Sequence, residues 1–211
     1  MSTCRRQQGA GLIEFMVASL IGIIALMTIG SLYINTMKVA TERYKQLTLL
    51  QNTLSVTQML DNDIQRAGFD GNNGYSLRLS GAAETLYTRN TTDGGLVAYA
   101  YYIGVSGASP LYKNVVYEQR SGVSSSLLIC EKKQTTLMDI NQVVNLTGSG
   151  LCYNLFDPKV IKVSDFDVSS EKIEGLKARS ALVNIALGTY LTEQPSLNTQ
   201  QALTIKQRNW Q

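Results

Sequence analysis

Histidine is absent from the 211-residue sequence, and proline and cysteine each occur only three times. Without histidine the chain lacks the general base of a Ser-His-Asp triad, and its thiols fall short of the four ligands of a structural zinc site. A phosphate-binding glycine loop and a dinucleotide fingerprint are also missing. We therefore expect a protein that is not an enzyme and that holds no cofactor or metal.

The charge and the composition predict one ordinary domain beside any membrane segment. The formal net charge is +3, from 19 basic and 16 acidic residues. Arg5 and Arg6 account for two of these charges, so the rest of the chain carries about +1. This balance does not predict a nucleic-acid partner. The 17 glycines and three prolines are too few for a disordered extension, so we expect one folded head.

A long uncharged run lies near the N-terminus. About 20 residues from Phe15 to Ile34 carry no charge, which is enough for a helix to cross a hydrocarbon core of about 30 Å. One carboxylate, Glu14, comes directly before them. A charge in a membrane helix costs about 2.5–3.5 kcal/mol on insertion scales, so it usually has a partner and a function. The alternative is that Glu14 lies near the membrane surface and reaches water.

The residues before Glu14 form a specific pattern. Gly9 is followed by Ala10, and Glu14 would stand fifth in a chain that begins at Ala10. This string resembles the class III signal of type IV pilins, which prepilin peptidase cuts after a glycine. The resemblance implies cleavage between Gly9 and Ala10, removal of a leader over residues 1–9, and N-methylation of Ala10. The family usually has phenylalanine at the position of Ala10, and this departure predicts less efficient processing.

A paired charge gives the spacing a physical reason. An α-amine has a reference pKa near 8 and is mostly protonated at pH 7. When the amine of Ala10 pairs with Glu14 of a neighbouring subunit, two costly buried charges become one paired site. The pair also favours one axial stagger between subunits. We therefore expect Glu14 to act in subunit assembly.

The flanking charges and the cysteines predict the topology. Arg5 and Arg6 precede the apolar run, which places the N-terminus in the cytoplasm and the head in the periplasm. Cys4 falls in the leader, so Cys130 and Cys152 remain as a pair in an oxidising compartment. We expect a disulfide between them. Two free buried thiols are the alternative.

A continuous helix is expected from Ala10 to about Ala67, because no proline interrupts this stretch and Gly68 follows it. It divides into a membrane half over residues 10–34 and an amphipathic half over residues 35–67. Apolar residues of the outer half recur at steps of three and four and predict one buried stripe: Tyr44, Leu47, Leu50, Leu54, Met59, Leu60 and Ile64. We expect the stripe to pack on the chain's own sheet. A partner surface is the alternative.

The expected end of the helix carries a second pattern. Arg66 favours the negative end of the helix dipole, Gly68 can adopt a left-handed cap, and residues 70–74 have turn chemistry. The order of Asp63, Ile64, Arg66, Ala67, Gly68 and Phe69 resembles the segment that closes the long helix of PilW-type minor pilins. The tail ALTIKQRNWQ also resembles the closing strand of these proteins.

From Tyr75 onward the pattern changes to extended segments rich in Val, Ile, Tyr and Thr. The expected strands are Ser76–Leu79, Thr85–Arg89, Leu96–Gly104, Asn114–Arg120, Ser125–Lys132, Val160–Asp167, Ala181–Leu191 and Ala202–Gln207, with a hairpin at Asp93-Gly94-Gly95. The fold class is α+β. The resemblance implies a type IV pilin-like fold, in which the long N-terminal helix packs on an antiparallel β-sheet head over residues 68–211.

These patterns make the chain similar to PilW-type minor pilins. The resemblance implies a subunit that prepilin peptidase cuts and that crosses the inner membrane once. Its partners would be other minor pilins and the major pilin, and its role would be to initiate or cap a type IV pilus, at whose tip it would reach the cell surface. Two alternatives stay open: a J-type minor pseudopilin of type II secretion, and a pilus-borne module for DNA uptake or adhesion. No small-molecule substrate is expected.

Overall fold

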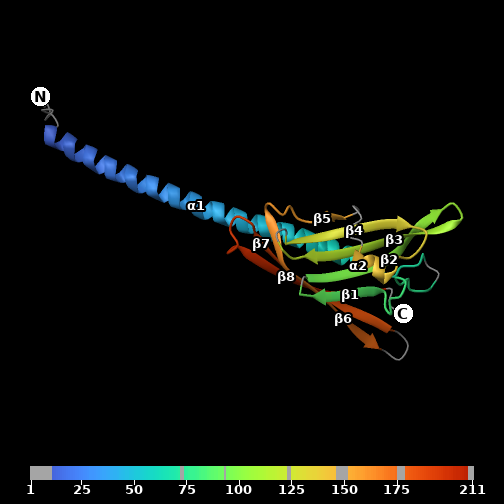
Figure 1. Cartoon of the computed structure of the whole chain (residues 1–211). Helices are drawn as coiled ribbons and strands as arrows, with labels where there is room; N and C mark the ends of the chain where they lie inside the picture. Colours follow the sequence, from blue (N-terminus) through green and yellow to red (C-terminus); the bar gives the residue numbers. More distant parts are fainter. Residues whose placement is uncertain are drawn as a thin grey trace, which may run out of the picture. The chain divides into compact units, whose positions relative to one another are not determined.

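The computed structural model describes residues 11–71, 74–92, 94–122, 125–145, 152–174 and 179–208. The chain divides into two compact units, Met1–Lys45 and Gln46–Gln211, called here the N-terminal unit and the C-terminal unit. Helix α1, Leu12–Ile64, begins in the first and ends in the second (Figure 1). Its expected start at Ala10 lies outside the described residues. Its end comes three residues before the expected Ala67.

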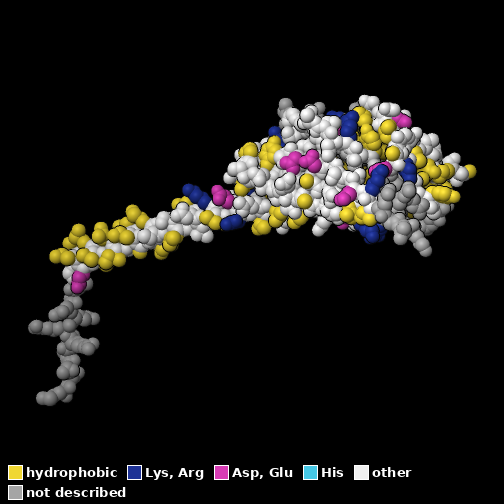
Figure 2. Space-filling view, turned by 90° about the horizontal axis from the view of Figure 1, so that it is seen from below, with side chains coloured by type: hydrophobic (Ala, Val, Ile, Leu, Met, Phe, Trp, Pro, Cys, Tyr) yellow, Lys and Arg dark blue, Asp and Glu magenta, His cyan; other side chains and the backbone are white. Residues whose placement is uncertain are grey.

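The described part of the N-terminal unit is helical and apolar. An 18-residue window of α1 has a mean hydropathy of 2.4 and no buried residue, and it meets the length and composition of a membrane span. Figure 2 shows hydrophobic side chains along this part of the helix. Leu12, Phe15 and Leu26 are each more than 70% exposed. This surface fits a single-pass anchor, because exposed apolar side chains are stable in lipid and not in water.

The C-terminal unit contains two antiparallel sheets and one short helix. The first sheet has the order β1-β2-β3-β4-β5 and the second the order β6-β7-β8. The strands of the first are β1 Leu86–Thr91, β2 Gly94–Ser106, β3 Ser109–Arg120, β4 Ser126–Gln134 and β5 Cys152–Asn154. The strands of the second are β6 Ile161–Glu174, β7 Arg179–Leu191 and β8 Asn198–Lys206, and α2 spans Ile140–Asn145. The α+β class and the pilin-like arrangement of a long apolar helix followed by antiparallel sheets are confirmed.

The first sheet is buried on both faces. One face packs with α1 and the second sheet in a core that includes Leu60, Tyr99, Phe166 and Ile185. The other face packs against α2 and the segment before β1 in a smaller cluster. Strand β2 is consequently buried from Leu96 to Tyr101 without alternation. Burial of both faces explains why this strand reads as a continuous apolar run.

Several expected elements differ from those observed. Residues Ser76–Leu79 form no strand, because their neighbourhood is tied to other segments: the Leu77 amide donates to the Gly68 carbonyl at 2.9 Å. Leu79 is buried in the smaller cluster. Strand β5 and helix α2 were not expected. One sheet was expected and two are present. The β1–β2 hairpin is present, with Thr91 opposite Gly94, although Asp93 lies outside the described residues.

The buried face of α1 also differs from the expected stripe. Leu60 and Ile64 are fully buried, but Leu50 is only half-buried, and the exposed members are Tyr44, Leu47, Leu54 and Met59. The observed face consists of Leu49, Thr53, Val56, Thr57, Leu60 and Ile64. The buried face is therefore rotated about the helix axis relative to the expected stripe, and it includes two threonines in place of apolar residues.

These threonines are compatible with burial because their hydroxyls are bonded. Thr53 donates to the Leu49 carbonyl and Thr57 to the Thr53 carbonyl, each at 2.8 Å. The Thr53 hydroxyl also lies 2.7 Å from that of Thr189 in β7. Buried polar groups cost little when they are paired. The core can therefore contain the two polar side chains of Thr53 and Thr57 on the buried face of α1.

Amide side chains and one glycine attach β6 to the first sheet. Asn90 donates to the Val168 carbonyl at 3.0 Å, and Gln119 accepts from the Phe166 amide at 2.8 Å. A Cβ at Gly95 would lie only 2.0 Å from the Phe166 carbonyl oxygen. Only glycine permits so close a backbone approach. The two sheets are thus joined by main-chain contacts as well as by the core.

Candidate functional site

Glu14 lies in the first turn of α1. Its Oε2 accepts a hydrogen bond from the Gly11 amide at 3.2 Å, and its own amide donates to the Gly11 carbonyl at 2.9 Å. This arrangement caps the helix, and the carboxylate faces the positive end of the helix dipole. The side chain is exposed, and the next charged residue is Lys38. Gly9 and Ala10, the expected cleavage site, lie outside the described residues.

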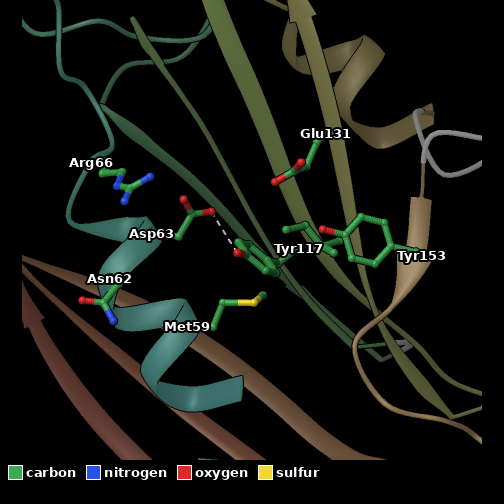
Figure 3. A pocket seen from close by; sticks show the side chains of 8 residues that line it. Met59, Asn62, Asp63, Arg66, Tyr117, Glu131 and Tyr153 are labelled. Atoms are coloured by element: carbon green, nitrogen blue, oxygen red, sulfur yellow. Dashed lines mark hydrogen bonds between the residues drawn. The ribbon is translucent and has the colours of Figure 1, made fainter. Parts of the chain in front are cut away.

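The end of α1 is anchored by a half-buried carboxylate. Asp63 Oδ2 accepts a hydrogen bond from the Tyr117 hydroxyl at 2.9 Å (Figure 3). It also accepts one from the Tyr99 hydroxyl at 2.6 Å. The two tyrosines come from β2 and β3 and their rings stack at 6.5 Å. Burial raises the pKa of Tyr99 well above its ordinary value, and the neighbouring Tyr117 and Asp63 raise it further. Burial and Asp63 likewise raise the pKa of Tyr117. Both hydroxyls therefore remain protonated donors at neutral pH.

A pocket of about 280 Å³ adjoins this anchor. It is lined by Met59, Asn62, Asp63, Arg66, Tyr117, Ile129, Glu131 and Tyr153 (Figure 3). Glu131 forms an ion pair with Lys113 at 2.5 Å. Both of its carboxylates therefore have donors within the fold, and the pocket lies between α1 and the first sheet.

A residue from the tail caps the C-terminal end of α1. Gln207 is 2% exposed, and its Nε2 donates to the Ala67 carbonyl at 3.1 Å and to the Ile64 carbonyl at 3.4 Å. Its backbone amide donates to Ala181 in β7 at 2.8 Å. The last carbonyls of a helix lack the regular partners of its interior. Here the Ile64 carbonyl also accepts from the Ala67 amide at 3.0 Å, and Gln207 adds a donor from the other end of the fold.

The motif after the helix has the expected backbone. Gly68 has a φ of 78°, the left-handed conformation of a helix cap. Its amide donates to the Ala100 carbonyl at 3.0 Å, so the cap joins directly to β2. Asn72 and Asn73 of the expected turn, and Asn209 to Gln211 of the tail, lie outside the described residues.

Cys130 and Cys152 form a disulfide with an S–S distance of 2.03 Å and a Cα–Cα distance of 4.1 Å. They stand opposite each other in the β4–β5 ladder. The bond therefore secures the short edge strand β5 to the first sheet. Cys4 lies outside the described residues.

Sequence reasoning missed two of these roles. The Asp63 anchor had a detectable signal, since a carboxylate in the last turn of a helix opposes the dipole and needs a donor. The cap by Gln207 had no detectable sequence signal, because the sequence of the tail does not show which helix end its side chains contact. Among the described residues, no three metal-binding side chains of the His, Cys, Asp and Glu types gather in one place.

The comparisons with known proteins give one match. Residues 42–207 match the family model of prepilin peptidase-dependent protein B. No curated protein and no solved structure matches the chain. The matched residues contain the outer part of α1, the Asp63 anchor and Gln207, whereas Glu14 precedes them. The match covers more than half of the chain, and the fold is pilin-like, so the chain is a type IV pilin-related protein and belongs to the family of prepilin peptidase-dependent protein B.

Proposed function

We propose that the protein is a minor pilin of the PilW type, which helps to initiate or cap a type IV pilus. The single observation that carries this proposal is the family match over residues 42–207. Support comes from Glu14, the one charge before an apolar stretch of α1 that carries no further charge until Lys38. A family named for its dependence on prepilin peptidase also supports processing of this chain.

The proposed maturation begins with removal of residues 1–9. The peptidase cuts between Gly9 and Ala10, and the new amine of Ala10 is methylated. Residues 10–34 form the membrane and assembly part of the helix, and residues 35–67 join it to the periplasmic head over residues 68–211. Arg5 and Arg6 stay in the cytoplasm until the cut, as expected for basic residues beside a span.

Assembly is proposed to work by packing and charge pairing. Exposed apolar side chains of the N-terminal unit pack with those of neighbouring subunits. Glu14 exchanges its weak intrahelical bond with Gly11 for the α-amine of a neighbour. The head then selects among other minor pilins and the major pilin through its exposed surface.

The test is a strain with an in-frame deletion of this gene, in which surface pili and export of secreted enzymes are both measured. Loss of pili with normal export is the expected result, and plasmid-borne wild-type protein should restore the pili. Normal pili with blocked export would replace the proposal by a J-type minor pseudopilin, since the family match is compatible with both machines. Normal pili and normal export would contradict both assignments.

A further inference from the structure

A second pocket in the C-terminal unit, named here the arginine pocket, lies where the end of α1 meets the tail. Its volume is about 470 Å³, and it is lined by Gln65, Arg66, Phe69, Tyr101, Tyr102 and Arg208. The two arginines are 142 positions apart in the sequence. The lining thus holds two guanidinium groups and three aromatic rings, and it has no carboxylate.

The two arginines have no ion-pair partner among the described residues. The acids nearest in sequence are committed to other donors. Asp61 accepts from the Gln65 amide at 2.9 Å, and Asp63 accepts from two tyrosines. Asp70 accepts from the Tyr75 amide at 2.6 Å. Both arginines line the pocket, and their charge is not neutralised by an ion pair with any described residue.

The aromatic wall is held in place by the fold. The Tyr102 ring packs edge-on to Tyr112 at 6.4 Å. Two of its ring carbons lie 2.7 and 2.8 Å from the point where Gly71 would carry a Cβ, so the Gly71 backbone covers the ring closely. The Tyr101 ring is buried and has the Lys113 ammonium 5.9 Å from its centre. Phe69 remains 36% exposed. A preformed wall with one accessible ring suits binding, because little ordering is needed on contact.

We propose that the arginine pocket receives a carboxylate from another pilin-related subunit, with an apolar side chain next to it resting on Phe69. A guanidinium binds a carboxylate through two parallel hydrogen bonds. Arginine and aromatic residues also dominate the energetically important centres of protein interfaces. The identity of the partner rests on the proposed function, whereas the chemistry of the pocket does not.

A nucleic-acid strand fits this site less well. Single-strand binders use a long basic groove that follows many phosphates. Here only two cations line the pocket, and Asp61, Asp63 and Asp70 lie within five positions of Arg66 along the chain. Two cations suffice for one carboxylate and are too few to follow a polyanion.

The test uses the full-length protein in detergent and a short blocked peptide that contains glutamate followed by 4-fluorophenylalanine. Fluorine NMR of the peptide reports weak binding directly. We expect saturable binding that is at least about tenfold weaker for the matched glutamine peptide. Arg66→Gln and Arg208→Gln should each weaken the binding by a similar factor. Arg66→Lys keeps the charge but loses the two parallel N–H donors of the guanidinium, so it should weaken the binding less.

Lys206→Gln is the matched control, because Lys206 is an exposed cation two residues from Arg208 that does not line this pocket. It should leave the affinity unchanged, and all variants should unfold at the wild-type temperature. Equal binding of the two peptides, or an equal effect of Lys206→Gln, would overturn the proposal. Tighter binding of oligothymidylate with the same arginine dependence would reassign the pocket to nucleic acid. None of these results depends on the pilus count in the deletion strain, so the two proposals fail separately.

Discussion

At the residue scale, Asp63 shows how a locally unfavourable choice becomes an anchor. Its carboxylate lies in the last turn of α1, where the helix dipole is negative, and no basic residue shares that turn. The Tyr99 and Tyr117 hydroxyls supply the compensation. Hydrogen bonds to a charged acceptor contribute about 1.5–3 kcal/mol each. The cost of the position is thus offset by contacts that also fix the register of α1 on β2 and β3.

The tyrosine pair predicts a loss of stability at alkaline pH. Both folded-state pKa values lie above the ordinary value near 10, so the contribution is fully present below about pH 10 and is lost as the pH rises further. With two additional protons bound in the folded state, the free energy of unfolding should fall by about 2.7 kcal/mol per pH unit there. Urea unfolding of the full chain in detergent at pH 9 to 11.5 measures this slope.

Tyr117→Phe should remove about half of that slope, since one titrating group is gone. The control is Tyr75→Phe, because Tyr75 is 78% exposed and takes no part in the anchor. If the slope of Tyr117→Phe equals that of the control, the two hydroxyls do not govern alkaline unfolding.

Glu14 predicts an assembly defect that depends on charge. Glu14→Gln keeps an acceptor for the Gly11 amide, since glutamine serves in a capping box, but it removes the charge. Glu14→Ala removes both. If pairing with a neighbour's amine is the role, both variants should stay in the membrane and be absent from sheared pili. Immunoblots of the two fractions measure this.

Ser19→Ala is the control for that experiment, because it removes a hydroxyl from the same apolar stretch. It should assemble normally. Normal assembly of Glu14→Gln together with failure of Glu14→Ala would show that the carboxylate only caps the helix.

At the scale of elements, α1 was predictable in its existence and length but not in its buried face. The long run without proline or charge predicted a helix of the right extent. The stripe was misplaced because apolar residues such as Leu47 and Leu54 are exposed, whereas Thr53 and Thr57 are buried. A sequence pattern registers hydrophobicity, and it cannot register that a threonine hydroxyl is bonded within its own helix.

The Gln207 cap predicts a defined loss of stability. Gln207→Ala leaves the Ala67 and Ile64 carbonyls without this donor. The expected cost is about 0.5–1.5 kcal/mol, the net contribution of a typical hydrogen bond, because the Ile64 carbonyl still accepts from the Ala67 amide at 3.0 Å. Thermal unfolding of the full chain in detergent, followed by circular dichroism, measures it. Gln201→Ala serves as the control, because Gln201 is half-buried and its side chain makes a long 3.4 Å hydrogen bond to Thr199. Equal effects of the two changes would contradict the capping role.

At the scale of the whole C-terminal unit, strand positions were predictable and their grouping was not. Segments rich in Val, Ile and Tyr marked seven of the eight strands, although β3 begins five residues earlier and β6 ends seven residues later than expected. Strand β5 was missed, and the expected strand Ser76–Leu79 is absent. That these strands form two sheets depends on contacts of high sequence separation, such as Asn90 with Val168 and Gln119 with Phe166. The arginine pocket was unpredictable for the same reason, since Arg66 and Arg208 meet only in the fold.

The close approach of the sheets at Gly95 makes a final prediction. Gly95→Ala places a methyl group 2.0 Å from the Phe166 carbonyl oxygen, so β6 must move. Overpacking of this kind costs about 1–3 kcal/mol. Gly30→Ala makes the same chemical change where nothing lies within 4 Å and should leave unfolding of the C-terminal unit unchanged. Near-ultraviolet circular dichroism of the tyrosines during urea unfolding distinguishes the two. An unchanged midpoint for Gly95→Ala would mean that the sheets tolerate separation.

The Gln207 cap also connects the structure to the order of synthesis. Ala67 leaves the ribosome 140 residues before Gln207, whose side-chain amide donates to its carbonyl. During translation and translocation, the end of α1 therefore lacks this donor until Gln207 has been synthesised. A subunit shortened before Gln207 would lack this contact beside the arginine pocket and would differ from the full-length subunit at that place.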